Sequence, residues 1–393
     1  MSTWRHLHPS SWVGSKKYNN LRLTKQECAA AFPGLTDGID RVVSLGPFTL
    51  PRQGNDSLLL ELYILHAEDG LTPELVDSQT ATLHQLHRAI LTSPFRLSDT
   101  IVTISIRDQP LGASFTYARP AYAAPTTNMP PITRAFVMPH FAWWAWPQPF
   151  IGSISSASVA IDSLERDLPF SKKDPGAVWR GTLSFENVYH PRSRQDLLRV
   201  ASGKEWADVQ PLEWTNSTVP SNAIPISDFC RYKYVIYTEG ITYSGRLPFL
   251  QMCRSVLVTI PIVWLQHTTH LVRPVFSTDL LGHSYSGKEI SREEEDIRQA
   301  WPKRYQPHEA NAVFVSRDWT DLEETVAWLE AHPAVAEKIA SNQRELFVGG
   351  GYFSPAAEVC YWRALIQGWA SAARIEPTRD GIPWEESLVA PNS

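Results

Sequence analysis

The chain is predicted to have an α/β fold made of two Rossmann-like domains that face each other across a cleft, followed by a C-terminal helix. Two observations favour this fold. Strand-like runs rich in β-branched residues alternate with helical patterns over most of the chain. With 393 residues, 43% of them hydrophobic, the chain can bury a large core, and chains of this size usually divide into two domains.

The expected division is into four parts. They are an N-terminal tail over 1–22, a first Rossmann-like domain over 23–165, a second over 166–350, and a returning C-terminal helix and tail over 351–393. The boundary between the two domains is placed at a charged, proline-containing joint that begins near residue 166.

The first domain has two clear helix signals. Thr24 is followed three residues later by Glu27, the pattern of a capping box, and the helix it opens should stop before Pro33. A second helix is predicted over 72–91, because its opening Thr-Pro pair supplies an N-cap and a first-turn proline. The apolar run at 57–66 fits either a strand or a helix.

Asp108 follows the next predicted element, a β-branched strand over 101–106. Doubly wound sheets place functional groups at the carboxyl ends of strands. A carboxylate held there could act as a general base that removes a proton from an acceptor hydroxyl. The alternative is an ordinary turn aspartate before Gln-Pro.

The segment 139–150, PHFAWWAWPQPF, concentrates Trp143, Trp144 and Trp146 among three prolines. It is too broken for a helix interior and too rich in proline for a central strand. Such a rigid aromatic loop could form a wall for a ligand or acceptor, and packing at a domain interface is the competing interpretation.

The second domain opens with Trp179-Arg180-Gly181-Thr182, and Arg192 and Arg194 follow. Planar guanidinium groups suit phosphate, and a glycine allows close backbone approach. Taken singly, each of these arginines would more often be a surface charge.

The clearest unit of the second domain is a strand over Tyr232–Thr238, a helix with Ser244 as its N-cap, and a strand over 255–260. Ligands of open α/β sheets lie outside the carboxyl ends of strands, near helix N-termini that favour anions. Arg246 is expected in the first turn of this helix, so the unit suits phosphate. A purely structural crossover remains the alternative.

Further elements are expected toward the C-terminus. Thr320 and Glu323 fit a capping box that opens a helix at Asp321. The polar segment 283–307 is expected to be irregular. The other predicted elements are a strand at 312–316 and helices at 334–347 and 355–373.

Composition and missing patterns exclude several function classes. The net charge of -5 gives no general attraction to nucleic acid or anionic membranes, and no segment has the length and apolarity of a signal or membrane anchor. The four cysteines show no C-x-x-C spacing, so neither a zinc site nor a dense disulfide framework is indicated, and they do not reveal a compartment. No D-x-D triplet supports a carboxylate-held metal, and no G-x-G-x-x-G occurs, which disfavours a nicotinamide oxidoreductase.

Six segments together resemble glycosyltransferase family 90, which includes fungal capsule-associated xylosyltransferase-like proteins and animal protein O-glucosyltransferases. The residues in these motifs are similar to those of fungal members, and the resemblance runs from about Leu23 to Ile366. The segments are IRDQP (106–110), PHFAWWAWP (139–147), VWRGT (178–182), DFCRYKYVIYTEGITYSGRLPFLQMCRSV (228–256), VSRDWTDLEE (315–324) and YFSPAAEVCYWRALI (352–366).

The resemblance implies an inverting transferase of the two-Rossmann (GT-B) type that uses a UDP-sugar donor and needs no metal or other cofactor. It implies Asp108 as the catalytic base and the tryptophan-rich loop as an acceptor and donor contact region. The implied UDP-sugar site comprises Arg180, Thr182, Arg194, Glu239, Tyr243, Ser244, Gly245 and Arg246.

The expected function is transfer of xylose or glucose from a UDP-sugar to a hydroxyl of a glycan or protein. The main alternative is an inactive nucleotide-sugar or glycan-binding protein of the same fold, and an oxidoreductase ranks third. Family members usually carry an N-terminal anchor or signal. None is visible in this sequence, so a truncated Golgi or ER protein and a cytosolic protein are both open.

Overall fold

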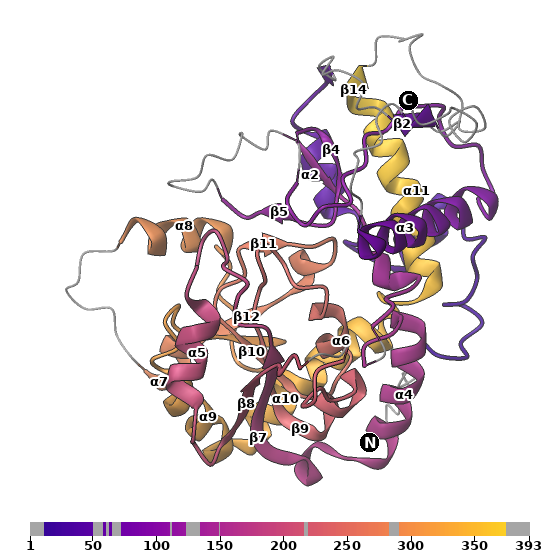
Figure 1. The fold of residues 1–393 in the computed structure, drawn as a ribbon. Helices are drawn as coiled ribbons and strands as arrows, with labels where there is room; N and C mark the ends of the chain where they lie inside the picture. The colour runs from indigo at the N-terminus through magenta and orange to yellow at the C-terminus, as the bar shows by residue number, and fades with distance from the viewer. Residues whose placement is uncertain are drawn as a thin grey trace.

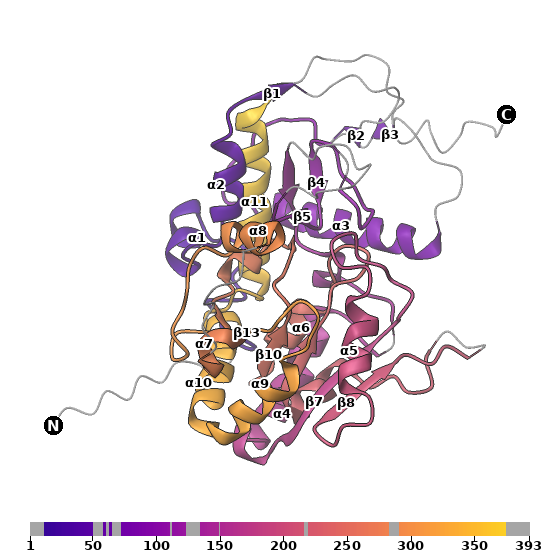
Figure 2. The same ribbon diagram turned by 90° about the vertical axis from the view of Figure 1, so that its left-hand side faces the viewer.

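The computed structural model describes residues 12–49, 58–59, 63–64, 72–110, 112–122, 134–148, 150–215, 219–282 and 291–374. Figures 1 and 2 show a lower part built around one large sheet and an upper part in which helices surround short strands.

The lower part is organised by a six-stranded sheet with the order β12-β13-β10-β9-β7-β8. Every neighbouring pair in this sheet is parallel. Its strands are β7 (Asp174–Gly181), β8 (Ala207–Pro211), β9 (Tyr232–Tyr237), β10 (Val256–Thr259), β12 (Pro274–Phe276) and β13 (Ala312–Phe314). The central strands are buried along almost their whole length, as a parallel sheet covered on both faces requires.

The sheet separates two hydrophobic cores. Along β9, Tyr234 and Ile236 belong to one core, whereas Val235 and Tyr237 belong to the other, as the period of two in a strand dictates. One core includes side chains of α5 (Ser193–Ala201), α7 (Ser277–Leu281), α9 (Leu322–Ala331) and α10 (Pro333–Arg344). The other includes side chains of α4 (Ile154–Asp167) and α6 (Leu247–Gln251) and continues into the upper part.

The described residues of the upper part form short strands and four α-helices. Its helices are α1 (Lys25–Ala31), α2 (Asp37–Val43), α3 (Pro73–Leu91) and α11 (Pro355–Ala372). Its described strand pairs are β4 (Ser114–Thr116) with β6 (Ala135–Val137), β1 (Phe48–Thr49) with β14 (Ala373–Arg374), and β2 (Leu58–Leu59) with β3 (Tyr63–Ile64). The pair of β5 (Arg119–Pro120) with β11 (Trp264–Leu265) joins the two parts.

Helix α11 returns from the lower part and packs against α1, α2 and α3 (Figure 1). The Cys28–Cys360 disulfide links it to α1. The buried Arg363 guanidinium donates to carbonyls of Leu21, Leu23 and Ala89. The upper part is therefore held together by a segment from the far end of the chain.

Several sequence predictions are confirmed. Thr24 and Glu27 form the expected capping box, Thr72 caps α3, and β9 and β10 are adjacent parallel strands connected through α6. The six-stranded sheet confirms the α/β class. Within the described residues only the lower part has such a sheet, so the expectation of two equivalent Rossmann-like layers is met in part.

Other predictions are corrected. The segment 101–106 forms no continuous strand and meets β4 through a bridge between Ile104 and Phe115. The expected tail is packed over 12–22, where Trp12 and Tyr18 are buried. Part of the expected irregular segment is helix α8 (Arg292–Ala300), opened by a capping box at Ser291, whereas 283–290 lies outside the described residues.

The second expected capping box is also wrong. Helix α9 begins after Asp321 and has no side-chain cap, because Thr320 hydrogen-bonds Asp318 and the Glu323 carboxylate is bound by Lys204. A tertiary partner thus outcompetes the local pattern.

Candidate functional site

The topology of the large sheet singles out one edge. From β7 the chain proceeds to β8 on one side, while β9 and β10 lie on the other side, so the strand order reverses between β7 and β9. In open α/β sheets, ligands bind outside the carboxyl ends of the strands at such a switch point. Here β7 ends at Gly181 and β9 ends at Tyr237, which directs attention to the residues that follow each strand.

Arg194 connects these two strand ends. Its Nη1 donates to the Thr182 carbonyl over 2.6 Å and its Nε donates to the Glu239 carbonyl over 2.9 Å. The residue is buried, and burial lowers its pKa to about 9, with the nearby Arg246 guanidinium contributing to the shift. Arg194 therefore remains protonated at neutral pH and fixes the switch point.

Arg246 is the second cation of this edge. Its guanidinium donates to the Arg180 carbonyl, and burial lowers its pKa to about 10, so it is also protonated at neutral pH. Among the described residues neither Arg194 nor Arg246 forms an ion pair with a carboxylate. Two positive charges without a counterion are thus placed together, which favours an anionic ligand.

Arg180 and Thr182 have different surroundings. The Arg180 guanidinium forms an ion pair with Asp208 at 2.9 Å and donates to the Asn222 carbonyl, so it stabilises the link from β7 to β8. The Thr182 hydroxyl accepts from the indole N–H of Trp214, an exposed residue, over 3.1 Å. Thr182 thus lies next to an exposed side chain, near the surface of the site. The Arg180 side chain is already paired with Asp208.

Glu239 points inward. Its Oε1 accepts from the backbone N–H groups of Val263 and Trp264, at 3.0 and 2.7 Å. Burial raises its pKa to about 8, although both backbone hydrogen bonds act in the opposite direction. The carboxyl group therefore positions the backbone behind the site, and the Glu239 carbonyl holds Arg194.

The loop from Gly240 to Arg246 is fixed from several sides. Asn187 Nδ2 donates to the carbonyls of Gly240 and Thr242, and Gln266 Nε2 donates to the carbonyl of Ser244. The expected N-cap role of Ser244 is wrong, because α6 begins at Leu247, has only five residues and has no side-chain cap. We call residues 240–246 the cation loop.

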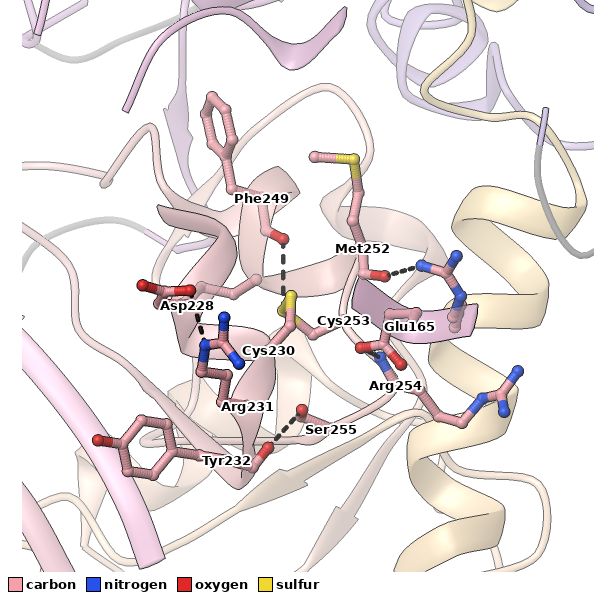
Figure 3. The surroundings of a disulfide bond; sticks show 12 residues. Glu165, Asp228, Cys230, Arg231, Tyr232, Phe249, Met252, Cys253, Arg254 and Ser255 are labelled. Carbon is pink, nitrogen blue, oxygen red and sulfur yellow. Dashed lines mark hydrogen bonds and ion pairs between the residues drawn. A yellow bond between two sulfur atoms is a disulfide. The ribbon is translucent and has the colours of Figure 1, made fainter. Parts of the chain in front are cut away.

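A disulfide closes the segment that contains this loop. Cys230, at the end of the 3-10 turn Ile226–Arg231, is bonded to Cys253, which follows α6 (Figure 3). On the adjacent α4, Glu165 accepts from the Arg254 backbone N–H (Figure 3) and from the buried Lys173 amine. The segment between the cysteines, which carries β9, the cation loop and α6, is thus anchored at both ends.

Asp108 lies beside the cation loop. The Thr242 hydroxyl donates to the Asp108 backbone carbonyl over 2.9 Å, although the residues are far apart in sequence. The Asp108 side chain keeps access to solvent, and the protein around it raises its pKa above the usual value of 3.8 by desolvation. A carboxylate that has a raised pKa and remains accessible to a substrate hydroxyl has the properties of a general base.

The three tryptophans of the aromatic loop point in different directions. Trp143 is a core residue that packs against His267 and Phe353. Trp144 is 39% exposed and stacks on His84 of α3. Trp146 packs near Gly245, since a Cβ built on Gly245 would lie 2.9 Å from the Trp146 ring. Trp146 thus packs against the cation loop, whereas Trp143 is buried and cannot form an exposed wall.

Two pockets in the described part of the chain differ in position. A narrow one of about 20 Å³ is lined by Arg180 and Arg246 together with apolar side chains such as Leu212 and Ile224. A wider one of about 650 Å³ lies before the amino ends of β12 and β13, with Arg273 and Lys303 in its lining. The narrow pocket lies by the carboxyl ends of β7 and β8 and reaches Arg246, so it adjoins the switch point, the region where parallel sheets bind ligands. Its volume is that of about one water.

Metal ligation has little support in the described residues. Glu165, Cys230 and Cys253 bring potential ligand atoms within 4.8 Å of one another. The two sulfurs are joined in a disulfide, so neither offers a thiolate to a metal.

Sequence reasoning missed several residues around the site. His140 packs against Gly245, Asn187 holds the cation loop, and His190 accepts from Arg317 near the start of α5. The pairing of all four cysteines was also not anticipated. No local pattern marks these residues, because their partners are distant in sequence.

Comparisons with known proteins agree on one family. The model of glycosyl transferase family 90 matches residues 75–277. An O-glucosyltransferase rumi homolog of Aedes aegypti is 22% identical over 58% of this chain and 50% of its own length. Its counterpart in Anopheles gambiae is 21% identical over 53% of this chain and 44% of its own length. The chain thus spans about half the length of these curated relatives.

Proposed function

The chain belongs to glycosyltransferase family 90, and from this premise we propose that it moves xylose or glucose from a UDP-sugar to a hydroxyl of a glycan or protein. The proposed reaction inverts the anomeric configuration and uses no metal ion. The proposed architecture is the GT-B type, in which the upper part provides the base and the lower part holds the donor.

One observation carries the proposal. The Thr242 hydroxyl donates to the backbone carbonyl of Asp108, which supports a position of this residue, whose pKa is raised, beside the loop that ends in Arg246. The proposed base and an arginine without a carboxylate partner among the described residues thus come from different parts of the molecule and lie near the switch point of the large sheet. Sugar transfer from a nucleoside diphosphate needs both groups, one for the incoming hydroxyl and one for the departing phosphate.

In the proposed reaction, the Asp108 carboxylate takes the proton of the acceptor hydroxyl as its oxygen attacks the anomeric carbon. The bond between this carbon and the β-phosphate oxygen breaks on the opposite face, so the configuration is inverted. The electron pair of that bond stays on UDP. Arg246 and Arg194 stabilise the increased negative charge, a contribution typically worth about 3 kcal/mol for one well-placed group.

We propose that the protein folds in an oxidising compartment such as the ER or Golgi. The two disulfides account for all four cysteines of the sequence, and such bonds persist mainly in secreted and luminal proteins. Among the described helices none is sufficiently long and apolar to cross a membrane.

The proposal is tested with a panel of UDP-sugars, measured for binding by calorimetry and for slow hydrolysis by UDP release. We expect UDP-xylose or UDP-glucose to be turned over. Binding of a UDP-sugar without any turnover, in the presence of varied glycan and peptide acceptors, would instead support an inactive binding protein.

The same assay tests metal independence. We expect turnover to survive EDTA, since the arginines supply the charge that a metal would supply. Loss of turnover in EDTA, with recovery on adding manganese, would contradict this part of the proposal.

A further inference from the structure

Two side chains at the cation loop, Tyr243 within it and His140 packed against Gly245, have polar atoms without a hydrogen-bond partner in the described part of the chain. Tyr243 is 5% exposed, and its hydroxyl has no hydrogen-bond partner among the described residues. The ring of His140 lies 5.5 Å from the Tyr243 ring. Buried groups of this kind in folded proteins normally have a partner, so an unpaired one calls for an explanation such as a ligand.

The hydrogen bonds of His140 define its proton. Its Nδ1 accepts from the Ala142 backbone N–H over 3.1 Å, so Nδ1 carries no hydrogen. Burial lowers the pKa of His140 to about 3, and the ring is therefore neutral. The single ring proton must then be on Nε2, which becomes a neutral hydrogen-bond donor.

This donor faces the cation loop. A Cβ built on Gly245 would lie 2.7 Å from His140 Nε2, so only a glycine leaves this nitrogen room. Among the described residues the His140 side chain hydrogen-bonds through Nδ1, and its Nε2, unlike the Tyr243 hydroxyl, is not fully buried, so it keeps slight contact with solvent. His140 and Tyr243 thus bring two polar groups without a partner in the described chain close together beside Gly245, one from each part of the molecule.

The position of these groups determines what they can bind. Tyr243 directly follows Thr242, which holds the Asp108 segment, and it lies three residues before Arg246. In the proposed reaction, the transferred sugar must lie between the base and the diphosphate. When water is displaced from its hydroxyls, each of them needs a new partner. Neutral groups such as an imidazole N–H and a phenol suit hydroxyls, whereas phosphate is better served by guanidinium.

We propose that His140 Nε2 and the Tyr243 hydroxyl hydrogen-bond hydroxyls of the transferred sugar and help to determine which sugar is accepted. This inference rests on the proposed function. It assigns His140 to the donor site and gives Tyr243 a contact with the sugar rather than with the diphosphate.

The test separates the sugar from the nucleotide. Affinities for UDP, UDP-glucose and UDP-xylose are measured by calorimetry for the wild type and for Tyr243→Phe, His140→Asn and His140→Gln. Asparagine can keep the acceptor for Ala142 and loses the distal N–H, whereas glutamine can keep a distal N–H. Tyr361→Phe is the matched control, because its hydroxyl is buried but already donates to the Val137 carbonyl.

We expect Tyr243→Phe and His140→Asn to weaken binding of the accepted UDP-sugar about three- to tenfold, the usual effect of one hydrogen bond. Their affinity for UDP should stay within about twofold, and His140→Gln should recover part of the loss. Tyr243→Phe should not lower the melting temperature, since it removes an unpaired group, whereas Tyr361→Phe should lower it without changing the ratio of UDP-sugar to UDP affinity.

The possible failures are distinct. If the wild type binds neither UDP nor a UDP-sugar, the proposed function is wrong, and this inference with it. If the wild type binds both and the affinity ratio is unchanged in Tyr243→Phe and His140→Asn, the inference alone is overturned. An equal loss for UDP and UDP-sugar would also overturn it, because the residues would then act through the loop or the phosphates.

Discussion

The two parts of the molecule carry their functional residues by different means. In the lower part, a continuous parallel sheet brings Arg194 and the cation loop to one edge, so the topology alone locates the cations. In the upper part the described strands have two or three residues, and Asp108 is held by a contact with Thr242 of the lower part. Asp108, the proposed base, is therefore positioned by a tertiary contact, whereas Arg194 and Arg246 lie at the edge of the sheet and are held there by hydrogen bonds.

The same comparison applies to individual arginines. Arg180 and Arg246 both line the narrow pocket, yet Arg180 is paired with Asp208 and Arg246 is not paired with a carboxylate of the described residues. Two identical guanidinium groups thus differ in whether they are already paired or can bind a ligand. The sequence does not reveal this difference. Substitutions distinguish residues that bind a ligand, which should change UDP affinity or turnover, from residues that stabilise the fold, which should change the free energy of unfolding.

The largest expected effect is that of Asp108→Asn. Removing the base should lower turnover about 10²- to 10⁴-fold, while UDP affinity stays within a few-fold, because the base acts in the transition state. In the wild type, turnover should fall on the acid side as the carboxylate becomes protonated, with an apparent pKa above 3.8. Turnover and UDP calorimetry at several pH values measure both.

Asp99→Asn is the matched control, since Asp99 is exposed and pairs with Arg96 on the surface. It should leave turnover unchanged. If Asp108→Asn lost UDP binding as severely as turnover, Asp108 would be a structural residue of the contact between the two parts.

The second effect distinguishes Arg246 from Arg180. Arg246→Ala should weaken UDP binding about tenfold or more and reduce turnover further, because charge on the leaving group increases in the transition state. Arg246→Lys should restore only part, since it keeps the charge and loses the planar fork. Calorimetric titration with UDP and turnover assays on folded protein provide the measurement.

Arg180→Ala should behave differently. It leaves Asp208 without its ion pair, so we expect the free energy of unfolding to fall by about 1–3 kcal/mol, with a smaller effect on UDP affinity than in Arg246→Ala. Urea unfolding measures the loss. Equal effects of both variants on UDP affinity would mean that Arg180 also binds the donor.

These predictions indicate what a sequence can and cannot specify here. Local signals were sufficient for α3, β9 and β10, because capping and β-branched runs act over a few residues. The expected βαβ unit also predicted that Arg246 lies shortly after a strand end, whereas Arg180, Thr182 and Arg194 were predicted from the arginine-rich segment and the family resemblance. The inward orientation of Glu239, the core position of Trp143 and the partner of Arg180 depend on contacts between distant segments, which no local pattern encodes.

The third prediction compares the two disulfides. Cys28–Cys360 closes a loop of 332 residues and joins α1 to α11, whereas Cys230–Cys253 closes 23 residues around the cation loop. Chain entropy predicts the larger stabilisation for the longer loop, within a usual range of about 2–5 kcal/mol. Cys28→Ala/Cys360→Ala should therefore lower the melting temperature more than Cys230→Ala/Cys253→Ala does.

Ligand binding should show the opposite order. The variant without Cys230–Cys253 should lose more UDP affinity, because the segment 230–253, which carries β9 and the cation loop, is then no longer closed by a covalent bond. Calorimetry below both melting temperatures tests this. A greater loss of UDP affinity without Cys28–Cys360 would show that α11 and the upper part position the donor as strongly as the sheet does.

The smallest expected effect concerns Glu239, the buried acid of the lower part. Its pKa is raised from 4.5 to about 8 by burial, so ionisation is less favourable in the folded than in the unfolded protein. The associated stability is fully present below about pH 4.5 and is lost as the pH rises toward 8. Glu239→Gln removes this loss, and its amide oxygen can still accept from the N–H groups of Val263 and Trp264. The variant should therefore gain in melting temperature relative to the wild type between pH 5 and 8, and the gain should level off above pH 8.

Thermal melts across this range measure it, with the exposed Glu186→Gln as a control that should show no such trend. A constant difference between Glu239→Gln and the wild type at all pH values would mean that Glu239 is ionised throughout and acts as a permanent negative charge behind Arg194.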